Sequence, residues 1–135
     1  MNDFITVVAA VIEKNGSYLI ARRSAPEHLK HKWEFPGGKV KKEESPQTAL
    51  QREMFEEFGI TVDVGPLLSS TTYDYPEFRI RLLAYKTKHI AGKFSLSDHE
   101  CIKWIKSNEC NDYEFVPADI PILERLIGNN NSNHP

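Results

Sequence analysis

The sequence contains little cysteine and no long apolar segment. Its 135 residues include only two cysteines, Cys101 and Cys110, which do not form a CxxC pair. We therefore expect neither a disulfide framework nor a structural zinc site, and a reducing compartment is predicted. No apolar run approaches the ~18 residues that span a bilayer, and the first residues lack the basic segment of a secretion signal. These features predict a soluble, cytoplasmic protein.

The chain also lacks a strong net charge. Its 17 Lys and Arg residues nearly balance its 19 Asp and Glu residues, so the formal net charge is -2. Because long nucleic acids are bound by basic patches, this balance does not indicate a nucleic-acid partner. A small phosphorylated ligand is compatible with it, since a bound metal or a few local cations can supply positive charge.

Apolar residues are frequent enough for one folded domain. They make up 40% of the chain, whose length is typical of a single domain. Apolar runs predict strands at 5–12, 18–21, 60–64, 67–73, 78–85 and 102–105, and a closing helix at 120–127. We predict an α/β fold with a mixed sheet between helices, one domain over 1–128, and a disordered polar tail over 129–135.

The strongest helix pattern lies in the middle of the chain. Ser45 suits the N-cap and Pro46 the first helical position, while Gly59 can adopt the left-handed conformation that ends a helix. Apolar residues recur every four positions, widened by a neighbouring aromatic: Leu50, Met54, Phe58 and Phe55.

The same helix is predicted to carry an acidic face. Glu53, Glu56 and Glu57 fall within about 100° of arc. Like charges three or four residues apart destabilise a helix, and Arg52 offsets only part of that repulsion. A divalent cation with hard oxygen ligands would offset the rest, so we expect Mg²⁺, with Mn²⁺ as a substitute. A solvated acidic face is the alternative interpretation.

The segment before this helix favours a phosphate–metal site. Pro36, Gly37 and Gly38 form a sharp turn whose backbone can approach a phosphate or offer a carbonyl to a metal. Lys39 adjoins the turn and can pair with phosphate oxygens. The turn and the acidic face together predict that phosphate and metal bind here.

A longer motif contains both features. From Gly38 the sequence runs GKVKKEESPQTALQREMFEEFGI. It matches the Nudix box without a gap: Gly, five residues, Glu, seven residues, then Arg-Glu-apolar-x-Glu-Glu-x-Gly-apolar. The chain thus resembles the Nudix hydrolase superfamily. The segments ARRS (21–24), WEFPGGKV (33–40) and PAD (117–119), together with Trp104, extend the resemblance to the MutT-like branch, of 8-oxo-dGTP diphosphatase and CTP pyrophosphohydrolase type.

The resemblance implies a Nudix α/β/α sandwich and cleavage of a nucleoside triphosphate to a monophosphate and pyrophosphate. It implies that Arg52 orients the glutamates and that Glu44 supports the loop and helix. The implied metal ligands are Glu53, Glu56, Glu57 and the carbonyl of Gly37 or Gly38.

MutT-like relatives carry a further acid before the strand tryptophan, as metal ligand or general base. Asp98 and Glu100, six and four residues before Trp104, both match such a position. The sequence does not separate them, and Glu53 is a third candidate for the base. His99 lies between the first two, and nothing in the sequence demands a role for it.

Other positions indicate how the base is recognised. By resemblance Arg23 contacts the nucleobase, and Phe35, with Tyr73 or Tyr75, can supply apolar surface. Asp119 stands where enzymes specific for 8-oxo-guanine carry asparagine. An ionised aspartate only accepts hydrogen bonds and suits the cytosine amine, whereas a protonated one can mimic asparagine. We expect CTP, dCTP, a 5-substituted dCTP and 8-oxo-dGTP as leading substrates; Asp119 as a helix cap is the alternative.

Three further functions compete with this prediction, of which RNA 5′-end processing is disfavoured by the short chain and the lack of a basic stripe. Hydrolases of ADP-ribose or dinucleoside polyphosphates usually carry motifs beyond the box, and we do not find them here. A non-catalytic nucleotide-binding module typically loses box glutamates or the arginine, all of which are present. We expect a small nucleotide substrate, no long nucleic acid or membrane partner, and either a monomer or a homodimer.

Overall fold

The computed structural model describes residues 4–132, with side chains described as far as residue 128. Within this range seven strands form one sheet: β1 (Phe4–Lys14), β2 (Ser17–Arg23), β3 (Trp33–Glu34), β4 (Gly37–Lys39), β5 (Thr61–Asp74), β6 (Arg79–Ala91) and β7 (His99–Ile105). The central order is β3-β2-β1-β6-β5, with β4 also paired to β1 and β7 to β2. β1 and β6 run parallel and the other pairs antiparallel, so the predicted mixed sheet is confirmed.

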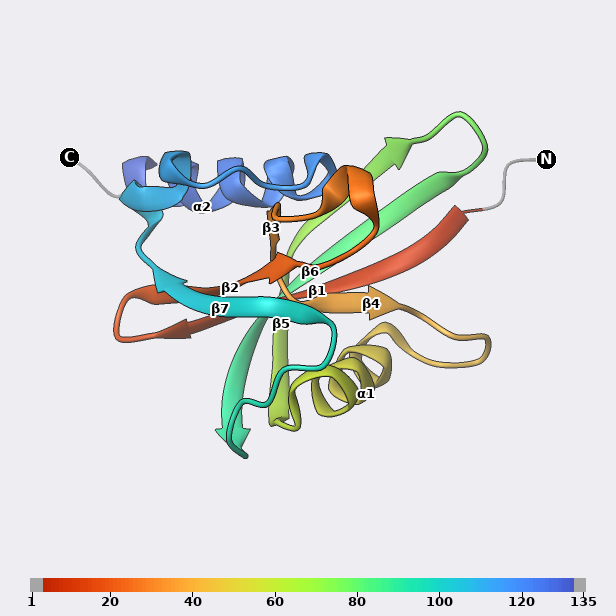
Figure 1. Ribbon diagram of the computed structural model, residues 1–135, viewed down its shortest axis with the longest axis horizontal. Helices are drawn as coiled ribbons and strands as arrows, with labels where there is room; N and C mark the ends of the chain where they lie inside the picture. Colours follow the sequence, from red (N-terminus) through yellow and green to blue (C-terminus); the bar gives the residue numbers. More distant parts are fainter. Residues whose placement is uncertain (1–3, 133–135) are drawn as a thin grey trace.

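Helices cover both sides of this sheet. Figure 1 shows α1 (Pro46–Phe58) on one side of the strands and α2 (Ile120–Ser132) on the other. Three short 3-10 helices lie in the connections: η1 (Glu27–Leu29), η2 (Ser107–Asp112) and η3 (Pro117–Asp119). This arrangement is the predicted α/β/α sandwich.

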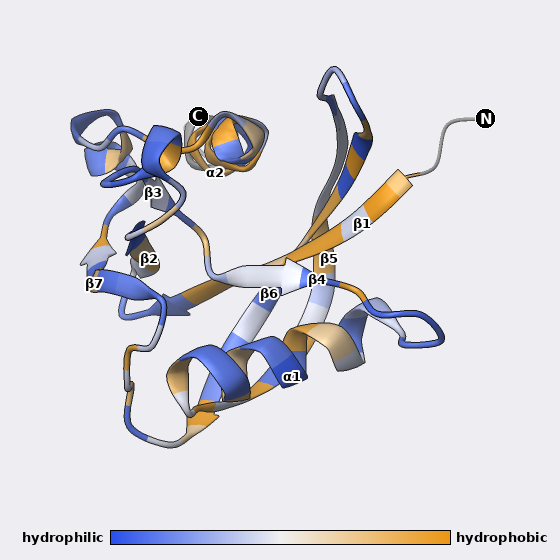
Figure 2. Ribbon diagram, turned by 45° about the vertical axis from the view of Figure 1, so that its right-hand side comes forward, coloured by the Kyte–Doolittle hydropathy of each residue, from blue (hydrophilic) through white to orange (hydrophobic). Residues whose placement is uncertain are grey.

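β1 is apolar along most of its length because both of its faces are covered. Val8, Ala10 and Ile12 belong to the core beneath α1, whereas Ala9 and Val11 belong to the core beneath α2. Successive side chains of a strand point to opposite faces, so a strand between two helical layers needs an unbroken apolar run. In Figure 2 much of β1 has the hydrophobic colour.

The ends of α1 form as predicted. The Ser45 hydroxyl accepts a hydrogen bond from the Thr48 amide at 3.1 Å, and Gly59 ends the helix with a φ of 70°. Leu50, Met54 and Phe58 are fully buried. The prediction that Phe55 widens this stripe was wrong: its side chain is 66% exposed, because it lies about 100° around the helix from Met54.

The strands after α1 are longer than predicted. The segments at 60–64 and 67–73 join into the single strand β5, whose pairing with β6 shifts register between Val64 and Leu67. Pro66 lies in that shift. It cannot donate to a neighbouring strand, and β5 lies at the edge of the sheet, where such a residue is tolerated.

The closing helix also extends beyond its predicted end. α2 continues to Ser132 because Gly128 does not take a positive φ and so does not cap the helix. Residues 129–132 of the predicted disordered tail are therefore helical, and residues 133–135 lie outside the described residues. Within the described part, no helix combines the length and apolar character needed to cross a membrane.

Candidate active site

A cavity of about 710 Å³ opens between the C-terminal end of α1 and the η3 segment. Most of the predicted site residues line it, namely Arg23, Phe35, Gly37, Gly38, Lys39, Glu57, Asp98 and Asp119. Tyr75, one of the two tyrosines expected to supply apolar surface, also lines it, as do Glu34 and His99, to which the sequence assigned no role. The acidic end of this cavity lies at α1, and the opposite end lies at Asp119.

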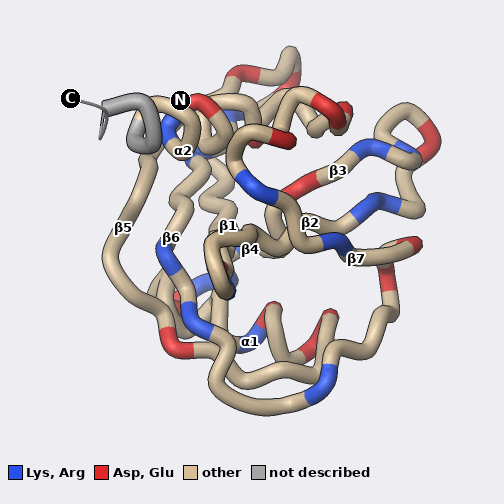
Figure 3. Tube along the Cα trace, turned by 90° about the vertical axis from the view of Figure 1, so that its left-hand side faces the viewer, with Lys and Arg blue, Asp and Glu red and all other residues tan. Residues whose placement is uncertain are grey.

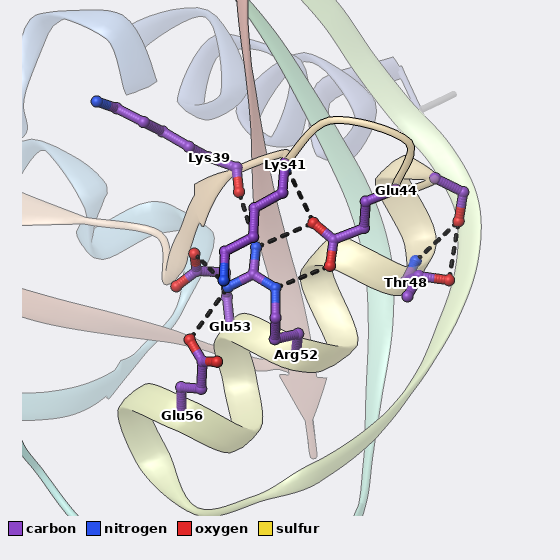
Figure 4. A network of polar contacts seen from close by, with 8 residues as sticks. Lys39, Lys41, Glu44, Thr48, Arg52, Glu53 and Glu56 are labelled. Atoms are coloured by element: carbon purple, nitrogen blue, oxygen red, sulfur yellow. Dashed lines mark hydrogen bonds and ion pairs between the residues drawn. The ribbon is translucent and has the colours of Figure 1, made fainter.

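Arg52 is the centre of the hydrogen-bond network at the acidic end. Its Nε and Nη2 donate to the two carboxylate oxygens of Glu44 at 2.8 and 3.0 Å. Its Nη1 donates to Glu53 and Glu56, both at 3.1 Å, and its Nη2 also reaches the carbonyl of Lys39 at 3.0 Å. Figure 4 shows the guanidinium between these acids, with the Lys39 side chain directed away from them.

This network accounts for Glu44. The hydrogen bonds from Arg52, and a further one from the Lys41 amide, lower the pKa of the Glu44 carboxyl to about 2. The acid at this box position therefore remains an anion and fastens the loop to the helix. Acidic positions recur on consecutive turns of α1 in Figure 3.

Two glycines shape the turn before α1. A side chain at Gly37 would collide with the Val8 carbonyl of the paired strand, and one at Gly38 would lie 2.2 Å from the Glu53 carboxyl carbon. Because Gly38 has no side chain, the Glu53 carboxylate can occupy the space beside it. The sequence motif places glycine here because the sheet and the helix approach each other so closely.

Glu57 is partly buried and has several other acids close to it. Burial raises the pKa of its carboxyl well above the ordinary range, and the nearby acids Glu53, Glu34 and Asp98 raise it further. A cation at this point would reverse both effects, because it stabilises the ionised form of an oxygen donor. The oxygen-only set of donors, with the carbonyls of the glycine turn beside it, fits a hard divalent cation.

The three box glutamates do not yet converge. Among the described residues, no three acidic, histidine or cysteine side chains lie closely enough to form a ready-made metal site. Glu53 lies beside Glu57, and both Glu53 and Glu56 are paired with Arg52. Glu56 is more than half exposed and free to turn, so a cation shared by all three would draw it away from Arg52.

The structure separates the two acids near Trp104. Asp98 lines the cavity, and its main-chain carbonyl accepts a hydrogen bond from the Ser24 hydroxyl at 2.7 Å. Glu100 does not line it: its Oε1 accepts from Arg22 at 2.9 Å and contacts His31 Nδ1 at 2.7 Å. Glu100 is thus tied to the outer side of β2, away from Glu57.

Asp119 lies at the opposite end and is buried. Its Oδ2 accepts a hydrogen bond from the Phe35 main-chain amide at 2.8 Å, across to the segment between β3 and β4. Burial raises the pKa of its carboxyl to about 8, and the charge of Glu34 adds to this effect. The Phe35 amide and Arg23 oppose it. At neutral pH this aspartate is therefore mostly protonated.

Sequence reasoning missed a polar chain that joins the two ends. Arg23 Nη1 donates to Glu34 Oε1 at 2.8 Å, and Glu34 Oε2 lies 2.8 Å from His99 Nε2. A charged residue between the buried aromatics Trp33 and Phe35 indicates such a role, since strand neighbours alternate in direction. Tyr75 also lines the cavity. The Tyr73 ring packs against the Tyr75 ring, with centroids 4.7 Å apart.

Comparison with known proteins identifies the family. The NUDIX domain model matches residues 7–125. The CTP pyrophosphohydrolase of Escherichia coli (strain K12) is 39% identical over 123 residues, covering 91% of both chains. The 8-oxo-dGTP diphosphatase of the same strain is 31% identical over 126 residues, covering 93% of this chain and 98% of its own.

Solved structures are similar as well. The E. coli ORF135 protein superposes with a TM-score of 0.87 at 35% identity, covering 98% of this chain and 94% of its own. The MutT protein of Methanosarcina mazei Go1 gives 0.82 at 27% identity, covering 96% of each. The chain therefore belongs to the NUDIX domain family. Within it, the chain is a Nudix hydrolase with MutT-like relatives.

Proposed function

We propose that this hydrolase cleaves a nucleoside triphosphate to a nucleoside monophosphate and pyrophosphate with Mg²⁺, and that Mn²⁺ can replace Mg²⁺. The observation that carries the proposal is the cavity itself, which joins Glu57, at the end of α1, to a buried hydrogen-bonding group, Asp119. A triphosphate would extend along the acidic end, and its base would reach Asp119. The relatives named for CTP and for 8-oxo-dGTP support the same class of substrate.

The residues proposed to hold the metal are Glu53, Glu56 and Glu57, with the Gly38 carbonyl and Asp98 beside them. When bound, Mg²⁺ would neutralise phosphate charge and lower the pKa of a bound water. Arg52 keeps Glu53 and Glu56 in reach, and Gly38 leaves room for the Glu53 carboxylate. Lys39, on the rim of the cavity, is placed to pair with phosphate oxygens.

The proposed reaction is an in-line displacement at the β-phosphorus. Water oxygen bonds to that phosphorus, the bond to the α–β bridging oxygen breaks, and the monophosphate leaves with the bridging oxygen. A carboxylate oxygen of Asp98 accepts the water proton. We assign the role of general base to Asp98 because Asp98 lines the cavity. Glu100 is instead paired with Arg22, and Glu53 accepts a hydrogen bond from Arg52.

We propose that Asp119 recognises the base in either of two protonation states. When it is protonated, Oδ2 accepts from Phe35 and the remaining O–H is a donor, as the amide of asparagine would be. This form suits the carbonyl of 8-oxo-guanine. The ionised form accepts only and suits the amine of cytosine. Arg23 and the apolar surface of Phe35 and Tyr75 complete this end.

A pyrophosphate-release screen tests the proposal. It compares CTP, dCTP, 5-methyl-dCTP, dGTP, 8-oxo-dGTP, ADP-ribose and a diadenosine polyphosphate with Mg²⁺, and Glu53→Gln serves as the blank. We expect Glu53-dependent monophosphate from a cytidine or 8-oxo-guanine triphosphate. Activity confined to ADP-ribose or the dinucleotide would retain the metal site and refute the substrate class. Tight nucleotide binding without turnover would identify a binding module instead.

A further inference from the structure

The imidazole of His99 is held on three sides inside the protein. Its side chain is only 4% exposed, and its ring stacks on Phe58 with centroids 5.2 Å apart. Its Nε2 lies 2.8 Å from Glu34 Oε2, and Glu34 is itself paired with Arg23. With one face packed and one nitrogen bonded, the ring has little freedom to rotate.

The remaining nitrogen of this ring points at Glu57. His99 Nδ1 is buried and has no hydrogen-bond partner among the described residues, and the Glu57 Oε1 atom lies 3.8 Å away. A buried polar atom without a partner destabilises the folded protein, so its presence indicates a partner gained in another state. A modest turn of the Glu57 side chain would bring its carboxylate within hydrogen-bond distance of Nδ1.

We infer that His99 is a positioning residue for Glu57, and that it holds this carboxylate in the orientation needed for the reaction. The inference rests on the proposed function, in which Glu57 is a metal ligand. Groups that bond to a ligand from behind fix its orientation, and their loss typically lowers metal affinity or activity about 10–100-fold.

The same contacts connect the two ends of the cavity. Arg23 and Glu34 lie on the base side, and His99 transmits their position to Glu57 through two edges of one rigid ring. A disturbance at His99 should therefore lower kcat while leaving the KM for the nucleotide nearly unchanged, because no contact to the base is removed.

Three substitutions of His99 separate positioning from packing. His99→Gln can place its amide near the Nε2 position, so it keeps the contact with Glu34 and loses the one with Glu57. His99→Asn can place its amide near Nδ1 and does the reverse. His99→Phe keeps the ring on Phe58 and removes both polar contacts. His89→Gln is the matched control, since His89 also packs on an aromatic ring, that of Phe94, but lies outside the cavity with both of its nitrogens bonded.

Activity and metal affinity are both measured. We expect His99→Gln and His99→Phe to lower kcat about 10–100-fold, to change KM less than about threefold, and to weaken Mn²⁺ binding to the nucleotide-free protein by a similar factor. His99→Asn should retain more of both than His99→Gln. His89→Gln should match the parent protein in kcat and in Mn²⁺ affinity.

Glu57→Gln distinguishes a failure of the positioning role of His99 from a failure of the proposed metal site. If Glu57→Gln is inactive and His99→Phe is fully active, the positioning role of His99 is wrong and the proposed function stands. If Glu57→Gln retains full activity and Mn²⁺ affinity, the proposed metal site itself is wrong. Equal losses in His99→Gln and His99→Asn that follow a fall in Tm would show that His99 serves only the packing of the core.

Discussion

The two ends of the cavity are built in different ways. The box residues of the acidic end come from one continuous segment, 38–60, in which a helix sets the acids in register and Arg52 bonds to Glu53 and Glu56. Asp98 joins them from a later segment. The base end is assembled from distant parts of the chain: Arg23, Phe35, Tyr75 and Asp119. The placement of the proposed metal-binding glutamates thus depends mainly on local structure, whereas recognition of the nucleobase depends on the tertiary fold. Substitutions at the acidic end should lower the rate for all substrates alike. Substitutions at the base end should change the order in which the substrates are preferred.

The largest expected effect tests the acidic end. Glu53→Gln keeps the size of the side chain and removes the charge proposed to bind the metal, so we expect kcat to fall by about 10³-fold. The loss should be equal for cytidine and 8-oxo-guanine triphosphates. Steady-state kinetics on both substrates measure it, and a loss confined to one of them would contradict the proposed division between the two ends.

A second pair of variants separates the acids near Trp104. Removing a general base costs at least about 10²-fold, so Asp98→Asn should lower kcat by this amount. Glu100→Gln should lower it less than about threefold, because Glu100 pairs with Arg22 and His31 outside the cavity. Single-turnover rates of the two variants, compared at one pH, give the result. The reverse ranking would move the base to Glu100.

The close approach of Gly38 to Glu53 predicts an intermediate effect. In Gly38→Ala the new methyl group would displace the Glu53 carboxylate, and a small misplacement of a reacting group can lower the rate by about 30-fold. Gly128→Ala is the matched control, since nothing lies within 4 Å of a side chain there. It should keep its rate and gain up to about 1 kcal/mol in the free energy of unfolding, because alanine favours a helix. Equal rates in both variants would remove the steric role of Gly38.

The smallest expected effect on rate concerns Asp119. Below a pH of about 8 this carboxyl is protonated and above it ionised. Raising the pH from 6.5 to 9 should therefore increase the preference for dCTP over 8-oxo-dGTP by about tenfold, the value of one hydrogen bond of about 1.4 kcal/mol. Asp119→Asn should favour 8-oxo-dGTP and abolish this pH dependence. The ratio of kcat/KM for the two substrates provides the test, and an unchanged ranking would exclude base recognition by Asp119.

The same substitution should affect stability. The pKa of Asp119 is about 8 in the folded protein and about 3.9 in an unfolded chain. The unfolded state therefore loses its proton first, and the folded state loses stability as the pH rises through this window. Asp119→Asn keeps an acceptor for the Phe35 amide and should gain on the order of 2 kcal/mol in the free energy of unfolding at pH 8.5. Urea unfolding at pH 4 and pH 8.5 would show whether the gain appears only at the higher value.

The part of this molecule that sequence could predict is the part built from near neighbours. The caps at Ser45 and Gly59 were predicted because capping depends on a few adjacent residues, and both are confirmed. The buried strand β1 was predicted for the same reason. The resemblance to the Nudix box then supplied the sandwich, since the box fixes how helix and sheet meet.

The remainder depends on pairings that no local pattern encodes. The single strand β5 was predicted as two segments because a bulge at Pro66 interrupts its pattern. The roles of Asp98 and Glu100 stayed open because only tertiary packing decides which acid meets Glu57 and which meets Arg22. His99 and Glu34 were missed because their partners lie 65 residues apart in the chain.

Arg52 gives the acid cluster a resident counter-ion. Its guanidinium already balances Glu44, Glu53 and Glu56 before any ion arrives from solution. The chain can therefore complete its core without metal, and the three box glutamates would converge only once metal binds. By the same reasoning a chelator should inactivate the enzyme without unfolding it, and adding the metal back should restore activity without a refolding step.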